Sequence, residues 1–84
     1  MYDIIYTSQA QKDAKKLVKS YLKTPCEKLL EIIKHHPYQP PYEKLGGEMD
    51  GYISRRINVQ HRLVYEVLEN IKTIKVLRMW SHYE

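Results

Sequence analysis

The alternation of apolar and polar residues along the chain predicts an α+β domain with the element order β-α-α-β-β-β-β. Residues 2–6 are rich in β-forming side chains and predict an opening strand. Between residues 10 and 22, apolar residues recur one, three or four positions apart, as they do on the buried stripe of a helix. Thr7 or Ser8 is the expected N-cap of this helix. Most lysines of the stretch fall off the stripe, so we expect them to face solvent.

A second helix is predicted from a start signal at residues 24–27. Their sequence, Thr-Pro-Cys-Glu, is that of a capping box with proline at the first helical position. The helix is expected to end at His35 and His36, because the negative end of the helix dipole favours cations. We expect both histidines to be solvent groups rather than metal ligands. The three prolines of residues 37–42 end the helix and exclude regular strand pairing.

The remainder of the chain has the alternation of β-strands. Asp50-Gly51 is a strong hairpin signal, because this pair suits a two-residue turn. The strands predicted around and after it are residues 43–49, 52–58, 61–68 and 72–79. We therefore expect an antiparallel-rich sheet with the two helices packed on one of its faces.

Arginines stand inside two of these strands, where apolar or neutral residues are usual. By the two-residue period of a strand, Arg55 shares a side with Ile53 and Ile57, whereas Arg56 points to the other side. If the isoleucines face the helices, Arg56 faces outward, and the pattern of the next strand leaves Arg62 on the same outer face. Arg56 and Arg62 are thus predicted to be neighbours across a hairpin, and Arg55 is predicted to be structural.

Two neighbouring guanidinium groups on an open sheet face suit the recognition of phosphate. Each guanidinium donates hydrogen bonds in a planar fork that matches an oxyanion. The alternative is that Arg56 and Arg62 are ordinary surface charges that meet Glu66 or Glu69. On the sequence alone, these two interpretations are about equally favoured.

Composition is compatible with an RNA-binding surface. The 84 residues make one domain, with a formal net charge of +4, eight tyrosines and no phenylalanine. Positive charge attracts polyanions, and tyrosine stacks on bases, although a basic surface without a ligand has the same composition. Cys26 is the only cysteine, so an intrachain disulfide is excluded; we expect a core residue there rather than a reactive thiol. With no signal peptide and no apolar run of membrane length, a cytoplasmic location is expected.

A general acid and a general base complete the candidate chemistry. His82 titrates near neutral pH and is the candidate acid, while Glu43 and Glu48 are the candidate bases. Each of these residues, taken singly, is more often an inert surface group. Together with arginine they are the groups that cleave RNA without a metal, by attack of the ribose 2′-hydroxyl on the adjacent phosphorus. We expect no cofactor, because no carboxylates are spaced as metal ligands.

The stretch from residue 50 to residue 65 resembles the Txe/YoeB family of toxins, within the RelE-like superfamily. The resemblance is carried by Ser-Arg-Arg-Ile at 54–57, His-Arg-Leu-Val-Tyr at 61–65 and His-Tyr at 82–83. Glu43 and Leu45 match a Glu-Pro-Leu element of that family. The resemblance implies a RelE-like fold and a ribosome-dependent mRNA interferase, which cuts mRNA in the ribosomal A site without a metal. It also implies a cognate antitoxin of the YefM/Phd type, whose acidic C-terminal segment wraps the toxin.

The resemblance also implies roles for single residues. Glu43 would be the general base, Arg62 the phosphate stabiliser and His82 the general acid. Arg56 would bind phosphate, and Tyr83 would help to position the substrate. Family members often carry a lysine just after the Glu-Pro-Leu element; position 46 is glycine here, so the nearest lysine, Lys44, is the candidate for that substrate contact. Glu84 follows the tyrosine on which family chains often end.

Two further hypotheses use the same residues differently. In the first, the domain would be a module that binds RNA, the ribosome or an antitoxin without cutting RNA. The arginines would then bind the partner and take no part in catalysis. Alternatively, it would be a structural subunit that dimerises through a sheet edge or its helices. Homodimerisation is also compatible with either of the other functions.

Overall fold

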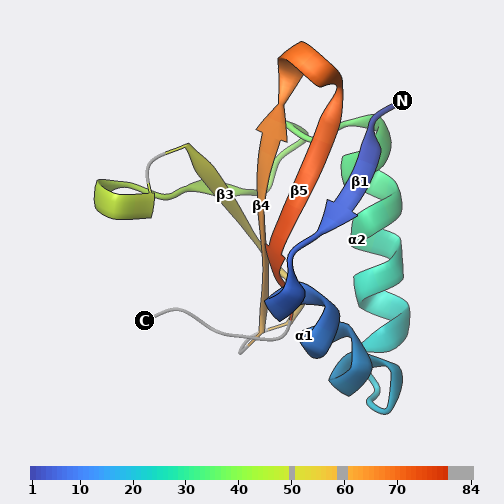
Figure 1. Ribbon diagram of the computed structural model, residues 1–84. Coiled ribbons are helices and arrows are strands. Elements are labelled where there is room, and N and C mark those ends of the chain that lie inside the picture. Colours follow the sequence, from blue (N-terminus) through green and yellow to red (C-terminus); the bar gives the residue numbers. More distant parts are fainter. Residues whose placement is uncertain (50, 59–60, 80–84) are drawn as a thin grey trace.

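The computed structural model describes residues 1–49, 51–58 and 61–79 of the chain (Figure 1). Its element order confirms the prediction of a strand, two helices and four strands. The elements are β1 (Asp3–Tyr6), α1 (Ser8–Val18), α2 (Lys23–His35), β2 (Glu43–Lys44), β3 (Tyr52–Arg56), β4 (Arg62–Leu68) and β5 (Thr73–Arg78), with 3-10 turns η1 (Gly47–Met49) and η2 (Glu69–Ile71).

One five-stranded sheet organises the fold, with the strand order β1-β5-β4-β3-β2. Only β1 and β5 pair in parallel, while the other three pairs are antiparallel, so the predicted antiparallel-rich sheet is confirmed. Figure 1 shows both helices on the same side of the sheet, where they pack beside β1 and β5. A parallel pair needs a long connection, and here the chain between β1 and β5 runs through both helices and strands β2 to β4.

The hydrophobic core lies between the helices and the inner face of the sheet. The helices contribute four buried residues to it, Ala10, Leu17, Cys26 and Ile33, and the sheet contributes Ile53, Leu63, Tyr65, Ile74 and Val76. The residues from β3 and β4 are those that the two-residue period had assigned to the helix side. In the described part of the chain, no helix is long and apolar enough to cross a membrane.

Helix α1 begins as predicted but ends early. Thr7 is its N-cap, and the threonine hydroxyl accepts a hydrogen bond from the Ala10 N–H at 3.1 Å. The predicted stripe continued to residue 22, but the helix ends at Val18, and Leu22 enters the core from the connecting turn instead. The Ser20 hydroxyl holds this turn by donating to the Leu17 carbonyl and accepting from the Leu22 N–H.

The predicted capping box of the second helix was wrong. Helix α2 begins at Lys23, and its N-cap, Leu22, makes no side-chain capping hydrogen bond. Thr24 therefore lies inside the first turn. The residue before this helix, Leu22, is buried in the core, and a capping sequence alone does not reveal that packing. The end of α2 at His35 agrees with the prediction.

The hairpin that joins β2 and β3 is wider than predicted. Strand β2 is only two residues long, and the 3-10 turn η1 follows it where the prediction continued the strand. Gly47 and Gly51 take positive φ angles of 61° and 93°, which permits this wider loop. Asp50, the other half of the predicted two-residue turn, lies outside the described residues.

Candidate functional site

The strand register gathers three of the predicted site residues on the outer face of the sheet. Glu43 of β2 lies opposite Ser54 of β3, and Arg56 of β3 lies directly opposite Arg62 of β4. Residues 54 and 56 share a face, and directly paired residues do so as well, so all four side chains belong to one face. This confirms that Arg56 and Arg62 are neighbours on the side away from the helices.

Arg62 and Glu43 form the ion pair at the centre of this face. The distance from Arg62 Nη1 to Glu43 Oε2 is 3.5 Å; 60% of the Glu43 side chain is exposed, against 19% for Arg62. A pair with one exposed member contributes no more than about 1 kcal/mol, so it opens readily. The alternative partner Glu69 accepts instead from the Tyr2 hydroxyl at 2.9 Å and lies 3.8 Å from Lys72 Nζ.

A hollow of about 140 Å³ lies over this ion pair. Its polar lining comes from Glu43, Ser54, Arg56 and Arg62, while Pro41 and Tyr42 add an apolar wall. Two guanidinium groups can hold an oxyanion here, and a carboxylate beside them can accept a proton. An aromatic ring at the margin offers a surface on which a base can stack.

Arg55 supports the site from the opposite face of β3, as the sequence predicted for a structural arginine. It is buried, and its guanidinium donates to the Gln39 carbonyl. The buried Tyr65 hydroxyl donates to the Pro37 carbonyl at 2.6 Å. Both contacts hold the proline-rich loop that leads into Glu43.

Two other candidates do not join this group. Lys44 follows Glu43 in the same strand and lies opposite Ile53, so its side chain belongs to the opposite face, where it borders a separate hollow with Ile53 and Val67. Glu48 lies in η1 and is exposed to solvent. The remaining candidates, the predicted acid His82 and Tyr83, lie outside the described residues.

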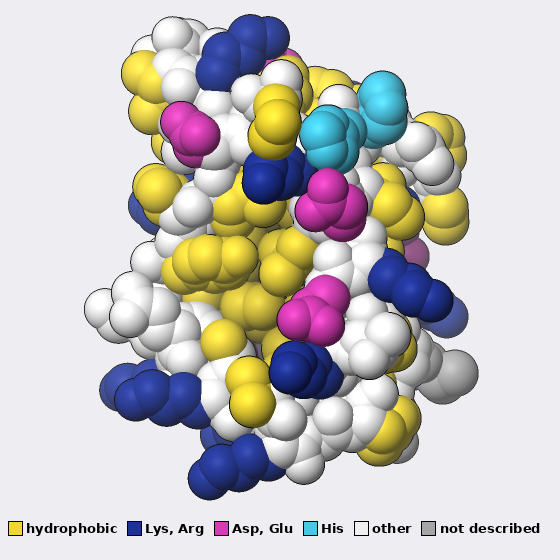
Figure 2. Space-filling view, turned by 90° about the vertical axis from the view of Figure 1, so that its right-hand side faces the viewer, with side chains coloured by type: hydrophobic (Ala, Val, Ile, Leu, Met, Phe, Trp, Pro, Cys, Tyr) yellow, Lys and Arg dark blue, Asp and Glu magenta, His cyan; other side chains and the backbone are white. Residues whose placement is uncertain are grey.

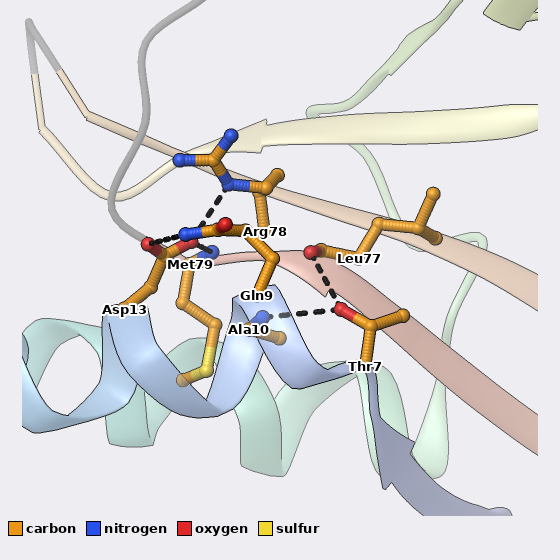
Figure 3. Close-up of polar contacts among 7 residues, drawn as sticks. All are labelled: Thr7, Gln9, Ala10, Asp13, Leu77, Arg78 and Met79. Atoms are coloured by element: carbon orange, nitrogen blue, oxygen red, sulfur yellow. Dashed lines mark hydrogen bonds and ion pairs between the residues drawn. The ribbon is translucent and has the colours of Figure 1, made fainter.

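Sequence reasoning missed Asp13 of α1, the buried carboxylate in Figure 3. It accepts hydrogen bonds from Arg78 Nε at 2.8 Å, from the Met79 N–H at 3.2 Å and from Gln9 Nε2 at 3.2 Å. Burial acts to raise the pKa of Asp13, but these hydrogen bonds outweigh it and the pKa is lowered. Position 13 lies three residues after Ala10 and four before Leu17 on the apolar stripe, and that spacing is the signal which could have revealed it.

Cys26 is a core residue, as predicted. Burial, together with the nearby negative charge of Glu27, raises its pKa to about 11. The thiol is therefore protonated at neutral pH and does not serve as a nucleophile. Among the residues that the structure describes, no three His, Cys, Asp or Glu side chains are grouped so that they could hold a metal ion.

A third hollow, of about 340 Å³, lies on the helix side of the molecule, between α1, α2 and β1. Its lining is mostly apolar and includes Tyr6, Leu17, Cys26 and Leu30. Figure 2 looks onto this side and shows an apolar depression bordered by lysine and glutamate side chains. It is distinct from the polar hollow over Glu43 and Arg62.

Comparisons with known proteins agree with this architecture. Solved structures similar to the chain include the YoeB/ParE toxin from Agrobacterium tumefaciens, with 27% identity, a TM-score of 0.89 and coverage of 96% of this chain and 99% of that one. The YoeB-YefM complex from Staphylococcus aureus matches with 33% identity, a TM-score of 0.82 and 99% coverage of both chains. The YoeB dimer from Staphylococcus aureus matches with 32% identity, a TM-score of 0.83 and 98% coverage of both chains.

The amino-acid sequence indicates the same family as the solved structures. No curated protein sequence matches the chain. The model of one protein family, described as the YoeB-like toxin of bacterial type II toxin-antitoxin systems, matches residues 5–83. This match spans nearly the whole chain, including both arginines and the paired glutamate. The chain therefore belongs to the family of YoeB-like toxins of bacterial type II toxin–antitoxin systems.

Proposed function

We propose that this protein is an endoribonuclease toxin that cuts mRNA in the A site of the ribosome. The observation that carries the proposal is the Glu43–Arg62 pair beside Arg56 on one open sheet face, in a chain of the YoeB-like family. A carboxylate and two guanidinium groups are what metal-independent cleavage of RNA needs on the side of the attacking oxygen. Such an enzyme works where ribosomes work, so we place it in the cytoplasm.

The proposed reaction begins when a substrate phosphate replaces Glu43 as the partner of Arg62. Glu43 then accepts the proton of the ribose 2′-hydroxyl, and the 2′-oxygen attacks the adjacent phosphorus. Arg62 and Arg56 stabilise the negative charge that develops on the phosphoryl oxygens. His82 donates a proton to the departing 5′-oxygen, so that a 2′,3′-cyclic phosphate and a 5′-hydroxyl result. No metal or cofactor takes part in this scheme.

Tyr83 is proposed to position the substrate. It follows His82 directly, so it would contact the same nucleotide. Lys44, on the other face of β2, is proposed to contact RNA or the ribosome away from the reacting phosphate, where a lysine acts as a point charge.

The partner that we propose is an antitoxin of the YefM/Phd type. The similar structures include a YoeB-YefM complex and a YoeB dimer. By this likeness, an acidic antitoxin segment would bind the toxin, with charge complementary to its net charge of +4. A homodimer in the absence of antitoxin is proposed on the same basis.

The decisive experiment is primer extension on mRNA in a purified translation reaction. The wild-type protein should produce cuts at the A-site codon, and His82→Ala should abolish them while keeping the thermal transition of the wild type. Cleavage that persists in the variant would contradict the role of His82. Intact mRNA with wild-type protein still bound to ribosomes, in a salt-dependent manner, would favour a binding module that does not cut.

A further inference from the structure

The end of β5 carries an irregularity next to the proposed site. The pairing of β4 with β5 shifts between Tyr65 and Val64, because Val76 lies opposite Tyr65 while Arg78 lies opposite Val64. Leu77 is thus the extra residue of a β-bulge. Bulges bend a strand and redirect the residues that follow, and they are frequent beside active sites.

Helix α1 holds this bulged end through two side chains, which we call the α1 clamp: Thr7 and Asp13. The Thr7 hydroxyl donates to the Leu77 carbonyl at 2.9 Å. Asp13 accepts from Arg78 Nε at 2.8 Å and from the Met79 N–H at 3.2 Å. Figure 3 shows Asp13 of α1 and Thr7, the N-cap of that helix, reaching onto three consecutive residues of the chain.

Burying the Asp13 carboxylate of the clamp is energetically unfavourable unless its hydrogen bonds are in place. The Asp13 side chain has no exposed surface, and burying a carboxylate is unfavourable unless its oxygens are hydrogen-bonded and its charge is compensated. One of its three donors is a backbone N–H that comes directly after the last residue of β5. The carboxylate therefore fixes the path of the main chain as well as the position of a side chain.

The register places the clamp on the row of residues that leads to the proposed base. Glu43 lies opposite Ser54, Ser54 opposite Val64, and Val64 opposite Arg78, so one cross-strand row runs from the base to the clamp. Because β4 and β5 are antiparallel, the last residue of β5, Arg78, lies opposite Val64, two residues after the start of β4 at Arg62.

His82 follows Met79 by three residues. Three extended residues span at most about 11 Å, so the position of Met79 limits where the proposed acid can act. A spacing of about 4.8 Å between strands puts the neighbouring strand, with Arg62, inside that range.

We propose that Asp13 is a positioning residue for RNA cleavage, which acts by holding Arg78 and Met79, the residues from which the chain continues to the proposed acid His82. This inference rests on the proposed function. Asp13 would touch neither substrate nor phosphate, and its effect would pass through the strand end that it holds. A carboxylate that merely stabilises the fold would make no such connection with His82.

The test compares Asp13→Asn with a matched control at the opposite end of the same strand. Thr73→Ala removes the buried hydroxyl that donates to the Ile71 carbonyl at 3.0 Å, far from the clamp. Cleavage is measured under single turnover on programmed ribosomes, below the thermal transition of each variant. We expect Asp13→Asn to slow the cleavage step by 10- to 100-fold with ribosome affinity unchanged, since misplacement by about 1 Å can cost 10²-fold. The control should stay within about twofold of the wild type.

A double mutant separates positioning from general stabilisation. If Asp13 acts through the acid, adding Asp13→Asn to His82→Ala should leave the residual rate unchanged, because the positioned group is already absent. Should the two effects multiply instead, the positioning role is overturned. If Asp13→Asn does not fold, Arg78→Gln is the substitute, because it removes one hydrogen-bond donor to Asp13. It should slow cleavage by 3- to 10-fold. In the His82→Ala background it should leave the residual cleavage rate unchanged.

Fluorescence gives a readout that does not depend on activity. Trp80 is the only tryptophan of the chain and lies between Met79 and His82 in sequence. Quenching by acrylamide should increase in Asp13→Asn and not in Thr73→Ala. Wild-type quenching together with wild-type cleavage in Asp13→Asn would overturn the proposal. If the wild-type protein leaves mRNA whole, the proposed function fails and the positioning role with it, whereas a change in quenching still shows that Asp13 holds this segment.

Discussion

Two arginine–carboxylate pairs lie among the residues that the structure describes, and their surroundings differ. Arg62 and Glu43 are 3.5 Å apart with the carboxylate 60% exposed, whereas Arg78 and Asp13 are 2.8 Å apart with the carboxylate fully buried. Water competes for the first pair and keeps it weak, while the second is shielded and carries two further hydrogen bonds on Asp13. In the first pair, a phosphate can replace Glu43 as the partner of Arg62. In the second pair, Asp13 keeps Arg78 in one position.

Breaking the exposed pair should show the largest effect, and it should fall on activity. Arg62→Ala is expected to lower the cleavage rate by about 10²–10³, because the charge that stabilises the transition state is lost. The melting temperature should drop by less than about 5 °C, since an exposed pair contributes little to the fold. Single-turnover cleavage and calorimetry of the same preparation measure both quantities. A large loss of stability would mean that this pair, too, is structural.

The buried pair should reveal itself in the pH dependence of stability. The pKa of Asp13 is lowered from its ordinary value of 3.8, so just below that pH the unfolded chain binds more protons than the folded one. The stability that Asp13 contributes is therefore complete above pH 3.8 and is lost as the pH falls further toward the lowered pKa. Urea unfolding between pH 3 and pH 6 should show a steeper acid loss for the wild type than for Asp13→Asn. Parallel curves would contradict the role of the buried charge.

The smallest expected effect concerns the reaction of Cys26 with a thiol reagent, which also serves as a control for both arginine–carboxylate pairs. Because burial raises the pKa of Cys26 to about 11, the folded protein should react with a thiol reagent at pH 8 far more slowly than the unfolded protein. Arg62→Ala should leave this protection unchanged, since the exposed pair does not touch the core. If the folded wild type reacts at the rate of the unfolded chain, Cys26 is not protected by the core around α2, and its assignment as a buried core residue is contradicted.

Features set by local alternation were predictable from the sequence. The outward positions of Arg56 and Arg62 and the buried position of Arg55 followed from the two-residue period, and their register confirms it. The proposal of Glu43 as the base came from a family resemblance, and the structure adds only that it meets Arg62. His82 and Tyr83 keep their roles as proposals, because they lie outside the described residues.

Features set by distant contacts were not predictable. The partner that makes a buried carboxylate tolerable at Asp13 is Arg78, which is 65 residues away in the sequence. The face on which Lys44 lies depends on how β2 pairs with β3, and only the register reveals that. Helix α2 starts at Lys23 rather than at the capping sequence of Thr24, directly after Leu22, which is buried in the core. In each case tertiary packing decided between local choices that the sequence left nearly equal.

The parallel pairing of β1 with β5 also bears on when a newly made chain acquires its structure. Thr7, which caps the first helix, holds a carbonyl 70 residues later, and β1 has no partner in the sheet until β5 exists. Contacts between segments so far apart in sequence form slowly, because a long loop must close first. During translation the opening strand must wait until the last strand has left the exit tunnel. A nascent chain from which β5 has not yet emerged therefore lacks the complete sheet, even though β1 and both helices have already been synthesised.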